Sequence, residues 1–124
     1  MTGAVPVRVR RVYDERTPQD GVRVLVDRLW PRGLTKDRAD LDDWCRAIAP
    51  SKALRVWYAH DRAKFPEFAR RYRAELAQPE PAAELGRLRE VARTGTLTLL
   101  TATKEVEISG AAVLADLLGA QHDC

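Results

Sequence analysis

One run of residues constrains the fold of this chain more than any other. Residues 22–26, Val-Arg-Val-Leu-Val, carry a single polar side chain, which suits a central strand covered on both faces of a sheet. Pro31 and Gly33 follow closely and prevent regular structure from continuing. Because open α/β sheets bind their ligands beyond the carboxyl ends of the strands, we expect a polar site directly after residue 26.

Two other segments predict strands. Residues 7–12 alternate valine and arginine imperfectly, and residues 97–102 form a run of leucine, threonine and alanine. The connection 13–21 contains turn-forming residues, among them Gly21, with room for one helical turn at Pro18. This connection is short for a parallel crossover. We favour a parallel arrangement of the strands at 7–12 and 22–26, and an antiparallel hairpin is the alternative.

Apolar residues at helical spacing predict about five helices. The first runs from a cap at Asp40 to Pro50, because four apolar side chains between them repeat at i, i+3, i+4 and i+7. Those four are Leu41, Trp44, Cys45 and Ile48. The other helices are expected at residues 52–59, 65–76, 82–94 and 110–118, with caps at Ser51 and Ser109.

The apolar stripes of these helices carry aromatic side chains, which we expect in the core rather than in a platform for stacking bases. They are Trp44, Trp57, Phe65, Phe68 and Tyr72. Together the strands and helices predict a single three-layer α/β domain over residues 1–124. Its sheet is expected to be mainly parallel, with three or more strands flanked by about five helices.

Length and composition restrict the class of protein. With 124 residues, 45% of them hydrophobic and 31% charged, the chain can form one globular core without a metal or a disulfide. No window approaches the roughly 18 apolar residues of a membrane span, and residues 1–6 lack a secretory pattern, so we expect a cytoplasmic protein with no membrane partner. Cys45 and Cys124 form no C-x-x-C pair, and His122 lies on an expected frayed tail, so no metal site is predicted.

Charged and aromatic side chains follow the end of the central predicted strand. Asp27, Arg28, Trp30 and Arg32 lie there, where arginines can donate to an anion and Trp30 offers a stacking or cation-π surface. The alternative is structural, with Trp30 in the core, Asp27 bonded to turn N–H groups and the arginines solvated. Asp27 should be withdrawn from water and act either as a bridge or as a base.

Lys104 and Glu105 follow the third predicted strand. Because the carboxyl ends of parallel strands lie at one edge of a sheet, we expect Arg32 and Lys104 to converge on an anion from two strand ends.

His60 and Asp61 follow the predicted helix 52–59 and form a second candidate. They can act as an acid-base pair, or Asp61 can cap the following helix. The catalytic candidates are therefore Asp27 and His60. The candidates for ligand binding are Arg28, Trp30, Arg32, Asp61, Lys104 and Glu105.

Two functional hypotheses remain open. The first is binding of a small phosphorylated or carboxylated molecule at the strand ends, with or without a reaction. The second is a basic accessory protein that contacts nucleic acid through Arg8, Arg10, Arg11 and the exposed arginines of the predicted helices, although a net charge of +3 is small for that role. The chain has no G-x-G-x-x-G, P-loop or G-x-S-x-G motif, and we expect no cofactor. The sequence leaves the oligomeric state open.

Residues 23–33, Arg-Val-Leu-Val-Asp-Arg-Leu-Trp-Pro-Arg-Gly, form a specific pattern. With Ile48-Ala49-Pro50-Ser51, Leu54-Arg55, Trp57, His60-Asp61, Phe68, Arg71-Tyr72 and Glu75-Leu76, it resembles the YeaO-like bacterial proteins over nearly the whole chain. That family is a domain of unknown function. The resemblance implies a small α/β domain whose second polar strand end lies near the C-terminus, here at Lys104 and Glu105.

The chain departs from the family pattern at two places. Thr101 stands where YeaO-like sequences tend to carry an aromatic residue, and Ile108-Ser109 stands where they tend to carry a His-Asn type segment. If these positions take part in chemistry, the resemblance implies that the activity is lost here or uses the Thr101 and Ser109 hydroxyls.

Overall fold

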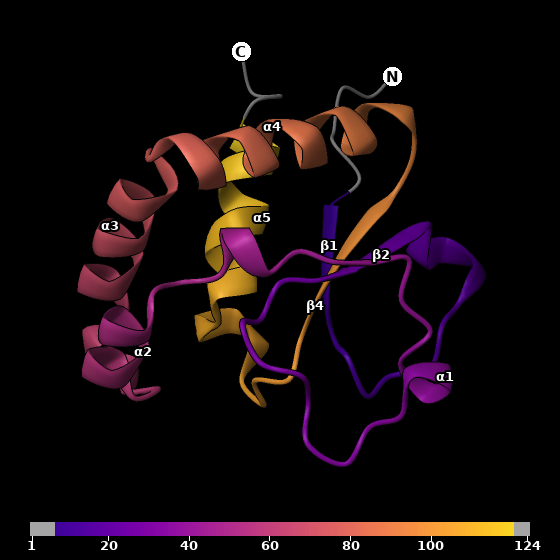
Figure 1. The fold of residues 1–124 in the computed structure, drawn as a ribbon, viewed down its shortest axis with the longest axis horizontal. Coiled ribbons are helices and arrows are strands. Elements are labelled where there is room, and N and C mark those ends of the chain that lie inside the picture. Colours follow the sequence, from indigo (N-terminus) through magenta and orange to yellow (C-terminus); the bar gives the residue numbers. More distant parts are fainter. Residues whose placement is uncertain (1–6, 121–124) are drawn as a thin grey trace.

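The centre of the sheet is β4, Leu97–Thr101, whose residues are all buried. It pairs in parallel with β1, Val7–Arg11, on one side and with β2, Val22–Leu25, on the other. A two-residue strand, β3 (Asp43–Trp44), pairs in parallel with β2 and completes the order β1-β4-β2-β3. The computed structural model describes residues 7–120, and Figure 1 shows that β4 lies between β1 and β2.

The parallel arrangement of β1 and β2 is confirmed, and the hairpin alternative is wrong, because β4 separates the two strands. The connection between them includes the expected helical turn, η1 (Pro18–Asp20), and the Thr98 hydroxyl donates to Asp20 O at 2.7 Å. Gly21 then has a φ of 61°, and a Cβ there would lie 2.2 Å from Thr96 O. The short crossover therefore depends on a glycine where it returns to the sheet.

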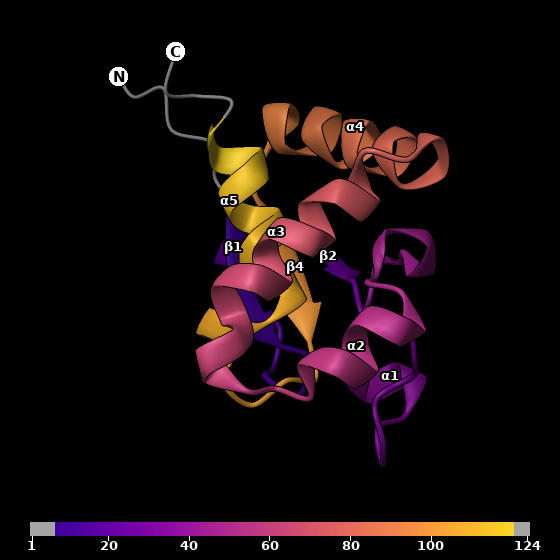
Figure 2. The same cartoon turned by 90° about the vertical axis from the view of Figure 1, so that its left-hand side faces the viewer.

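Five helices flank the sheet within the described residues. They are α1 (Lys36–Ala39), α2 (Lys52–Tyr58), α3 (Phe65–Leu76), α4 (Pro79–Thr94) and α5 (Gly110–Ala120). Residues of α2 to α5 pack with Val24, Leu97 and Leu99 on one face, and Ala39 of α1 packs with Leu25 and Leu100 on the other. Figures 1 and 2 both show α4 lying across one end of α3 and α5. The prediction of a single α/β domain with a parallel sheet is confirmed.

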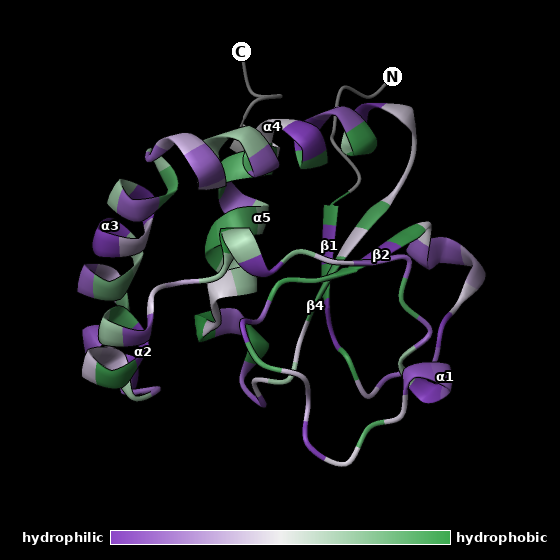
Figure 3. Cartoon of the chain, in the orientation of Figure 1, coloured by the Kyte–Doolittle hydropathy of each residue, from purple (hydrophilic) through white to green (hydrophobic). Residues whose placement is uncertain are grey.

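The helices on one face of the sheet differ in hydropathy, and the other face is covered largely by loops. Figure 3 shows that α5 is mostly hydrophobic, whereas α3 and α4 alternate between hydrophilic and hydrophobic residues. This agrees with their places, because α5 contacts β1 and β4 directly and also contacts α3. The opposite face is covered by α1 and by irregular segments that contribute the side chains of Trp30, Leu34 and Leu41. Long loops therefore form much of that layer.

Side-chain caps begin two helices where the sequence indicates. Ser51 Oγ accepts a hydrogen bond from Leu54 N at 3.1 Å at the start of α2. Ser109 Oγ accepts one from Ala112 N at 3.2 Å at the start of α5. Both predicted caps are confirmed, and they fix where α2 and α5 enter the fold.

The predicted helix before Pro50 is wrong. The N–H groups of Asp42 and Cys45 donate to Arg23 O and Leu25 O, both at 2.9 Å, so this segment extends the sheet as an edge strand. A single 3-10 turn, η2 (Arg46–Ile48), follows it.

The apolar residues of this segment match helical spacing but face opposite sides of the sheet. Leu41 and Trp44 pack with the Leu25 side, whereas Cys45 and Ile48 pack with the core under α2 to α5. Asp40 begins no helix. It ends α1 with a φ of 49°, and its N–H donates to Lys36 O at 3.1 Å.

The five aromatic residues expected in the core are confirmed there. Phe68 and Tyr72 are buried, and Phe68 stacks on Tyr58 with a ring separation of 4.0 Å. Trp57 and Phe65 are partly buried against the same cluster, and Trp44 packs in the cluster on the opposite face. The rings of Trp57, Phe65, Phe68 and Tyr72 therefore hold α2 and α3 against the sheet, and Trp44 packs on its other face.

The one arginine within the predicted apolar strand is fully buried. The side chains of Arg23 and Asp20 have no exposed surface, and Arg23 Nη1 lies 2.7 Å from Asp20 Oδ2. Arg8 and Arg10 also donate to Asp20, at 3.1 and 2.8 Å. Arg23 Nη2 donates to Ala39 O at 3.0 Å. This ion cluster therefore links β1, η1, β2 and α1 on the face opposite the large helices.

Burial opposes ionisation of Asp20, but hydrogen bonds from Arg23, the Thr17 N–H and Arg10 outweigh it and lower its pKa from 3.8 to about 2. The ionised carboxylate therefore stabilises the fold above about pH 4, and this stabilisation is lost as the pH falls through about 2.

We predict that Asp20→Asn lowers the free energy of unfolding at pH 7 by about 3–5 kcal/mol, because Arg23 stays buried without its counter-charge. The difference from the wild type should narrow in acid, where the wild-type carboxylate is protonated. Urea denaturation monitored by circular dichroism at several pH values measures both effects. Asp37→Asn, an exposed change on α1, is the control. A loss below about 1 kcal/mol at pH 7 contradicts the prediction.

We predict that Phe68→Ala lowers the free energy of unfolding by about 3–5 kcal/mol, because it removes a buried ring that packs on Tyr58 and Tyr72. Denaturant unfolding measures the loss. Arg70→Ala on the exposed face of the same helix should cost less than about 1 kcal/mol. Similar losses for the two variants would show that the aromatic cluster does not stabilise the fold.

No helix among residues 7–120 is long and apolar enough to cross a membrane. The expected frayed tail, with His122 and Cys124, lies outside the described residues.

Candidate ligand-binding cleft

A cleft of about 510 Å³ opens beside the carboxyl ends of β2 and β4. The residues directly after β2, from Val26 to Arg32, all line it. The other walls come from Tyr13, from Pro50, Arg55, Val56, Tyr58, His60 and Phe68, and from Ala102, Thr103, Ser109 and Gly110. The cleft therefore lies at the edge of the sheet where the sequence analysis expects a site, and its size suits a small molecule.

Asp27 joins the ends of the two central strands. Its Oδ1 accepts a hydrogen bond from the Thr101 hydroxyl at 2.8 Å, and its Oδ2 accepts one from Ala102 N at 2.7 Å. Trp44 Nε1 also donates to Asp27 O at 2.8 Å. The N–H that holds this carboxylate therefore comes from the residue after β4 and not from the turn after Asp27. Together with the buried Thr101 hydroxyl it makes Asp27 fasten β2 to β4.

Burial raises the pKa of Asp27 above its ordinary value of 3.8. The Ala102 N–H and the Thr101 hydroxyl act in the opposite direction, as does the nearby Arg55 guanidinium. Because burial is the largest of these effects, the ionised form costs stability, and that cost appears as the pH rises through the pKa of the folded protein.

Three arginines line the cleft, against one carboxylate, Asp27. Arg28 donates through Nε to Pro50 O at 3.3 Å. Arg55 Nε is buried and has no hydrogen-bond partner within residues 7–120. Arg28, Arg32 and Arg55 form no salt bridge to any of the described residues, whereas Arg8, Arg10, Arg16 and Arg23 all do. The cleft is therefore cationic, with guanidinium groups that can receive an anion.

His60 also lines the cleft, and it directly follows the strained end of α2. Ala59 and His60 have φ values of 47° and 57°, which non-glycine residues rarely adopt. Such a conformation costs on the order of 1–3 kcal/mol for each residue and clusters at functional sites. The same turn makes Asp61 the cap of η3 (Arg62–Lys64), where its Oδ1 accepts from Ala63 N at 3.0 Å.

The structure brings together five of the eight residues predicted for the site. Asp27, Arg28, Trp30, Arg32 and His60 line one cleft. Trp30 also packs edge-to-face on Trp44 with a ring separation of 5.2 Å, and its Nε1 donates to Leu34 O at 2.6 Å. The structural and the functional interpretation of Trp30 are therefore compatible.

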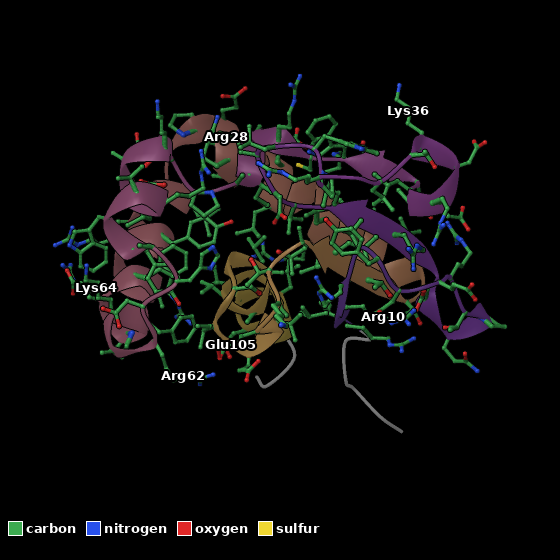
Figure 4. The ribbon with its side chains drawn as sticks, turned by 90° about the horizontal axis from the view of Figure 1, so that it is seen from below. Arg10, Arg28, Lys36, Arg62, Lys64 and Glu105 are labelled. Atoms are coloured by element: carbon green, nitrogen blue, oxygen red, sulfur yellow. The ribbon has the colours of Figure 1, made fainter. Side chains whose placement is uncertain are left out.

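The other three predicted residues lie outside the lining of the cleft. Asp61 is the cap described above, and Lys104 is exposed. Glu105 pairs with Arg62, and Figure 4 shows this pair well apart from Arg28. Thr103 is the last residue after β4 that lines the cleft before Ser109, so Lys104 does not share the cleft with Arg32.

The sequence analysis missed Arg55, Tyr13 and Val56 as site residues. Arg55 belongs to the motif shared with YeaO-like proteins, and that was the available signal. Tyr13 is brought in from the segment after β1, and its hydroxyl donates to Arg32 O at 3.0 Å. Ser109 lines the cleft as well as capping α5, and Thr101 holds Asp27 beneath it. Both departures from the family pattern therefore fall at this site.

Cys45 is not a nucleophile in this fold. Its thiol donates to Glu84 Oε1 at 3.2 Å, and burial together with Glu84 raises the pKa to about 11. A thiol of that pKa is protonated at neutral pH and therefore unreactive. Among the described residues, no group of three or more His, Cys, Asp and Glu side chains is placed to hold a metal ion.

Residues 6–123 match the family model described as the inactive DUF488-N3 subclade. The chain belongs to this subclade. The uncharacterized protein Rv3073c of Mycobacterium tuberculosis is 50% identical over 112 residues, which cover 90% of this chain and 92% of that protein. The uncharacterized protein YeaO of Escherichia coli is 42% identical over 112 residues, covering 90% of this chain and 96% of that protein. The resemblance to YeaO-like bacterial proteins is thus confirmed, and no solved structure matches.

We predict that Asp27→Asn changes the pH dependence of stability. The wild type should lose stability relative to this variant as the pH rises from about 4 to 7, because only the wild type ionises a half-buried carboxyl. Denaturant unfolding across this range measures the difference, with Asp37→Asn as the control. A constant difference, or one that changes in the opposite direction, contradicts the raised pKa of Asp27.

Proposed function

We propose that this protein binds a small anionic molecule in the cleft through a phosphate or carboxylate group. The observation that carries the proposal is the contrast among its arginines. Arg8, Arg10 and Arg23 are all paired with the buried Asp20 carboxylate, whereas Arg28, Arg32 and Arg55 line the cleft and form no salt bridge to a described residue. Guanidinium groups pair with phosphate and carboxylate through two parallel hydrogen bonds, which supports these two ligand classes.

Arg55 supports the proposal from a second element. It lines the cleft from α2 and forms no salt bridge to a described residue, so no carboxylate competes with a ligand for its guanidinium group. Arg55 lies on α2, and Arg28 and Arg32 lie on the loop after β2. Hydrogen bonds from Tyr13 to Arg32 O and from Thr101 to Asp27 hold that loop. These attachments fix the backbone that carries the arginine side chains, and a site on a fixed backbone loses less entropy on binding.

The geometry and the family description together favour binding over catalysis. The subclade is described as inactive, and we extend that description to this chain. Asp27, the stronger catalytic candidate, already accepts two hydrogen bonds from the protein, so it acts in this proposal as the brace of the cleft floor.

We predict that Arg55→Met weakens binding of inorganic phosphate by about tenfold or more, because it removes a charge-assisted donor from the site. Isothermal titration calorimetry at low ionic strength measures the affinity. Arg32→Ala should weaken binding in the same direction.

Arg38→Ala is the matched control for these variants, because Arg38 is exposed on α1 and lies outside the cleft. It should retain the wild-type affinity, and circular dichroism verifies that each variant is folded. Undetectable binding by the wild type, or equal affinity in Arg55→Met, contradicts the proposal.

The alternative of a nucleic-acid contact through Arg8, Arg10 and Arg11 gains no specific support. Arg8 and Arg10 both donate to Asp20, and Arg11 lies over the Tyr13 ring at 4.9 Å. Salt dependence distinguishes the two functions. Binding to a nucleic-acid backbone weakens steeply with salt, whereas a small ligand in a cleft is displaced by competing small anions.

A further inference from the structure

The mouth of the cleft is apolar. Four large hydrophobic side chains of the described residues are exposed: Tyr13 at 38%, Val22 at 36%, Leu29 at 65% and Val56 at 69%. Three of the four, Tyr13, Leu29 and Val56, line the cleft. Single exposed apolar residues are ordinary on protein surfaces, but a group that meets at one concave site marks a contact surface.

These three residues come from separate segments, and each is tied to one of the cleft arginines. Leu29 follows Arg28 in sequence, and Val56 follows Arg55. Tyr13 reaches the site from the segment after β1 and donates to Arg32 O. Cationic and exposed apolar residues therefore line the same cleft, and a ligand bound by the guanidinium groups lies close to this apolar rim of Tyr13, Leu29 and Val56.

We propose that the ligand is an amphipathic small molecule, with an anionic group held by the arginines and an apolar or aromatic body that covers the rim. The inference rests on the proposed function and specifies its ligand class. Charge complementarity determines which end enters the cationic cleft. The cleft volume of about 510 Å³ lies in the range for small molecules. Burial of the rim supplies affinity that inorganic phosphate alone lacks.

The test compares two probes that share a phosphate group, inorganic phosphate and phenyl phosphate. The wild type should bind phenyl phosphate at least about tenfold more tightly, because the phenyl ring buries the apolar rim. The double variant Leu29→Ser/Val56→Ser should lose most of this preference, measured as the ratio of its affinities for the two probes. Both side chains are exposed, so the fold should tolerate the exchange.

Val22→Ser is the matched control, because Val22 is also an exposed aliphatic residue but lies outside the cleft. It should keep the full preference for phenyl phosphate. If the double variant is unfolded by circular dichroism, the single variants Leu29→Ser and Val56→Thr replace it, and each should lose part of the preference.

The outcomes separate this inference from the proposed function. If inorganic phosphate binds and phenyl phosphate binds no more tightly, the amphipathic ligand is excluded and the anion site stands. If neither probe binds, the anion site fails as well. If sedimentation shows that the wild type is a dimer and the double variant a monomer, the rim is a contact between two copies, and the inference is overturned.

Discussion

The pairing of β2 with β4 is the constraint on which the rest of the structure depends. It brings two strand ends to one edge of the sheet, and the Asp27 carboxylate fastens them by accepting hydrogen bonds from the Thr101 hydroxyl and the Ala102 N–H. The loop that follows Asp27 carries Arg28 and Arg32, so the brace also positions the cationic wall of the cleft. This arrangement buries a carboxylate, which lowers the stability of the fold when Asp27 is ionised, as the raised pKa of Asp27 indicates.

The fold uses its arginines in two ways, one on a face of the sheet and the other at the carboxyl ends of its strands. On one face, Arg8, Arg10 and Arg23 pair with the buried Asp20 carboxylate in a cluster that ties β1, η1 and β2 together. At the strand ends, Arg28, Arg32 and Arg55 meet without such a carboxylate partner among the described residues. A net charge of +3 hides this division, because pairing within the fold decides which cations are available to a ligand.

Most of the secondary structure follows from local patterns, and the exceptions have physical causes. The buried strands and the caps at Ser51 and Ser109 could be predicted because each signal lies within a few residues. The edge strand after Asp40 could not be predicted. Its apolar residues point to both sides of the sheet, and over this short stretch their spacing is the same as on one face of a helix. Burial of Arg23 could not be predicted either, since its environment depends on β1 and α1, which the fold brings to it.

The candidate site divides in the same way. The residues from Asp27 to Arg32 are contiguous and follow a recognisable strand, so the sequence reveals that wall. Tyr13 and Arg55 reach the cleft only through the tertiary fold, and Lys104 does not line the cleft.

The most direct test of the anion site is a phosphate titration followed by the arginine Nε–H signals in ¹H–¹⁵N NMR spectra. The account predicts saturable shifts for Arg28, Arg32 and Arg55, and no shift for Arg23, which is already bonded to Asp20. Saturable shifts confined to arginines outside the cleft, or no saturable shift at all, would contradict it.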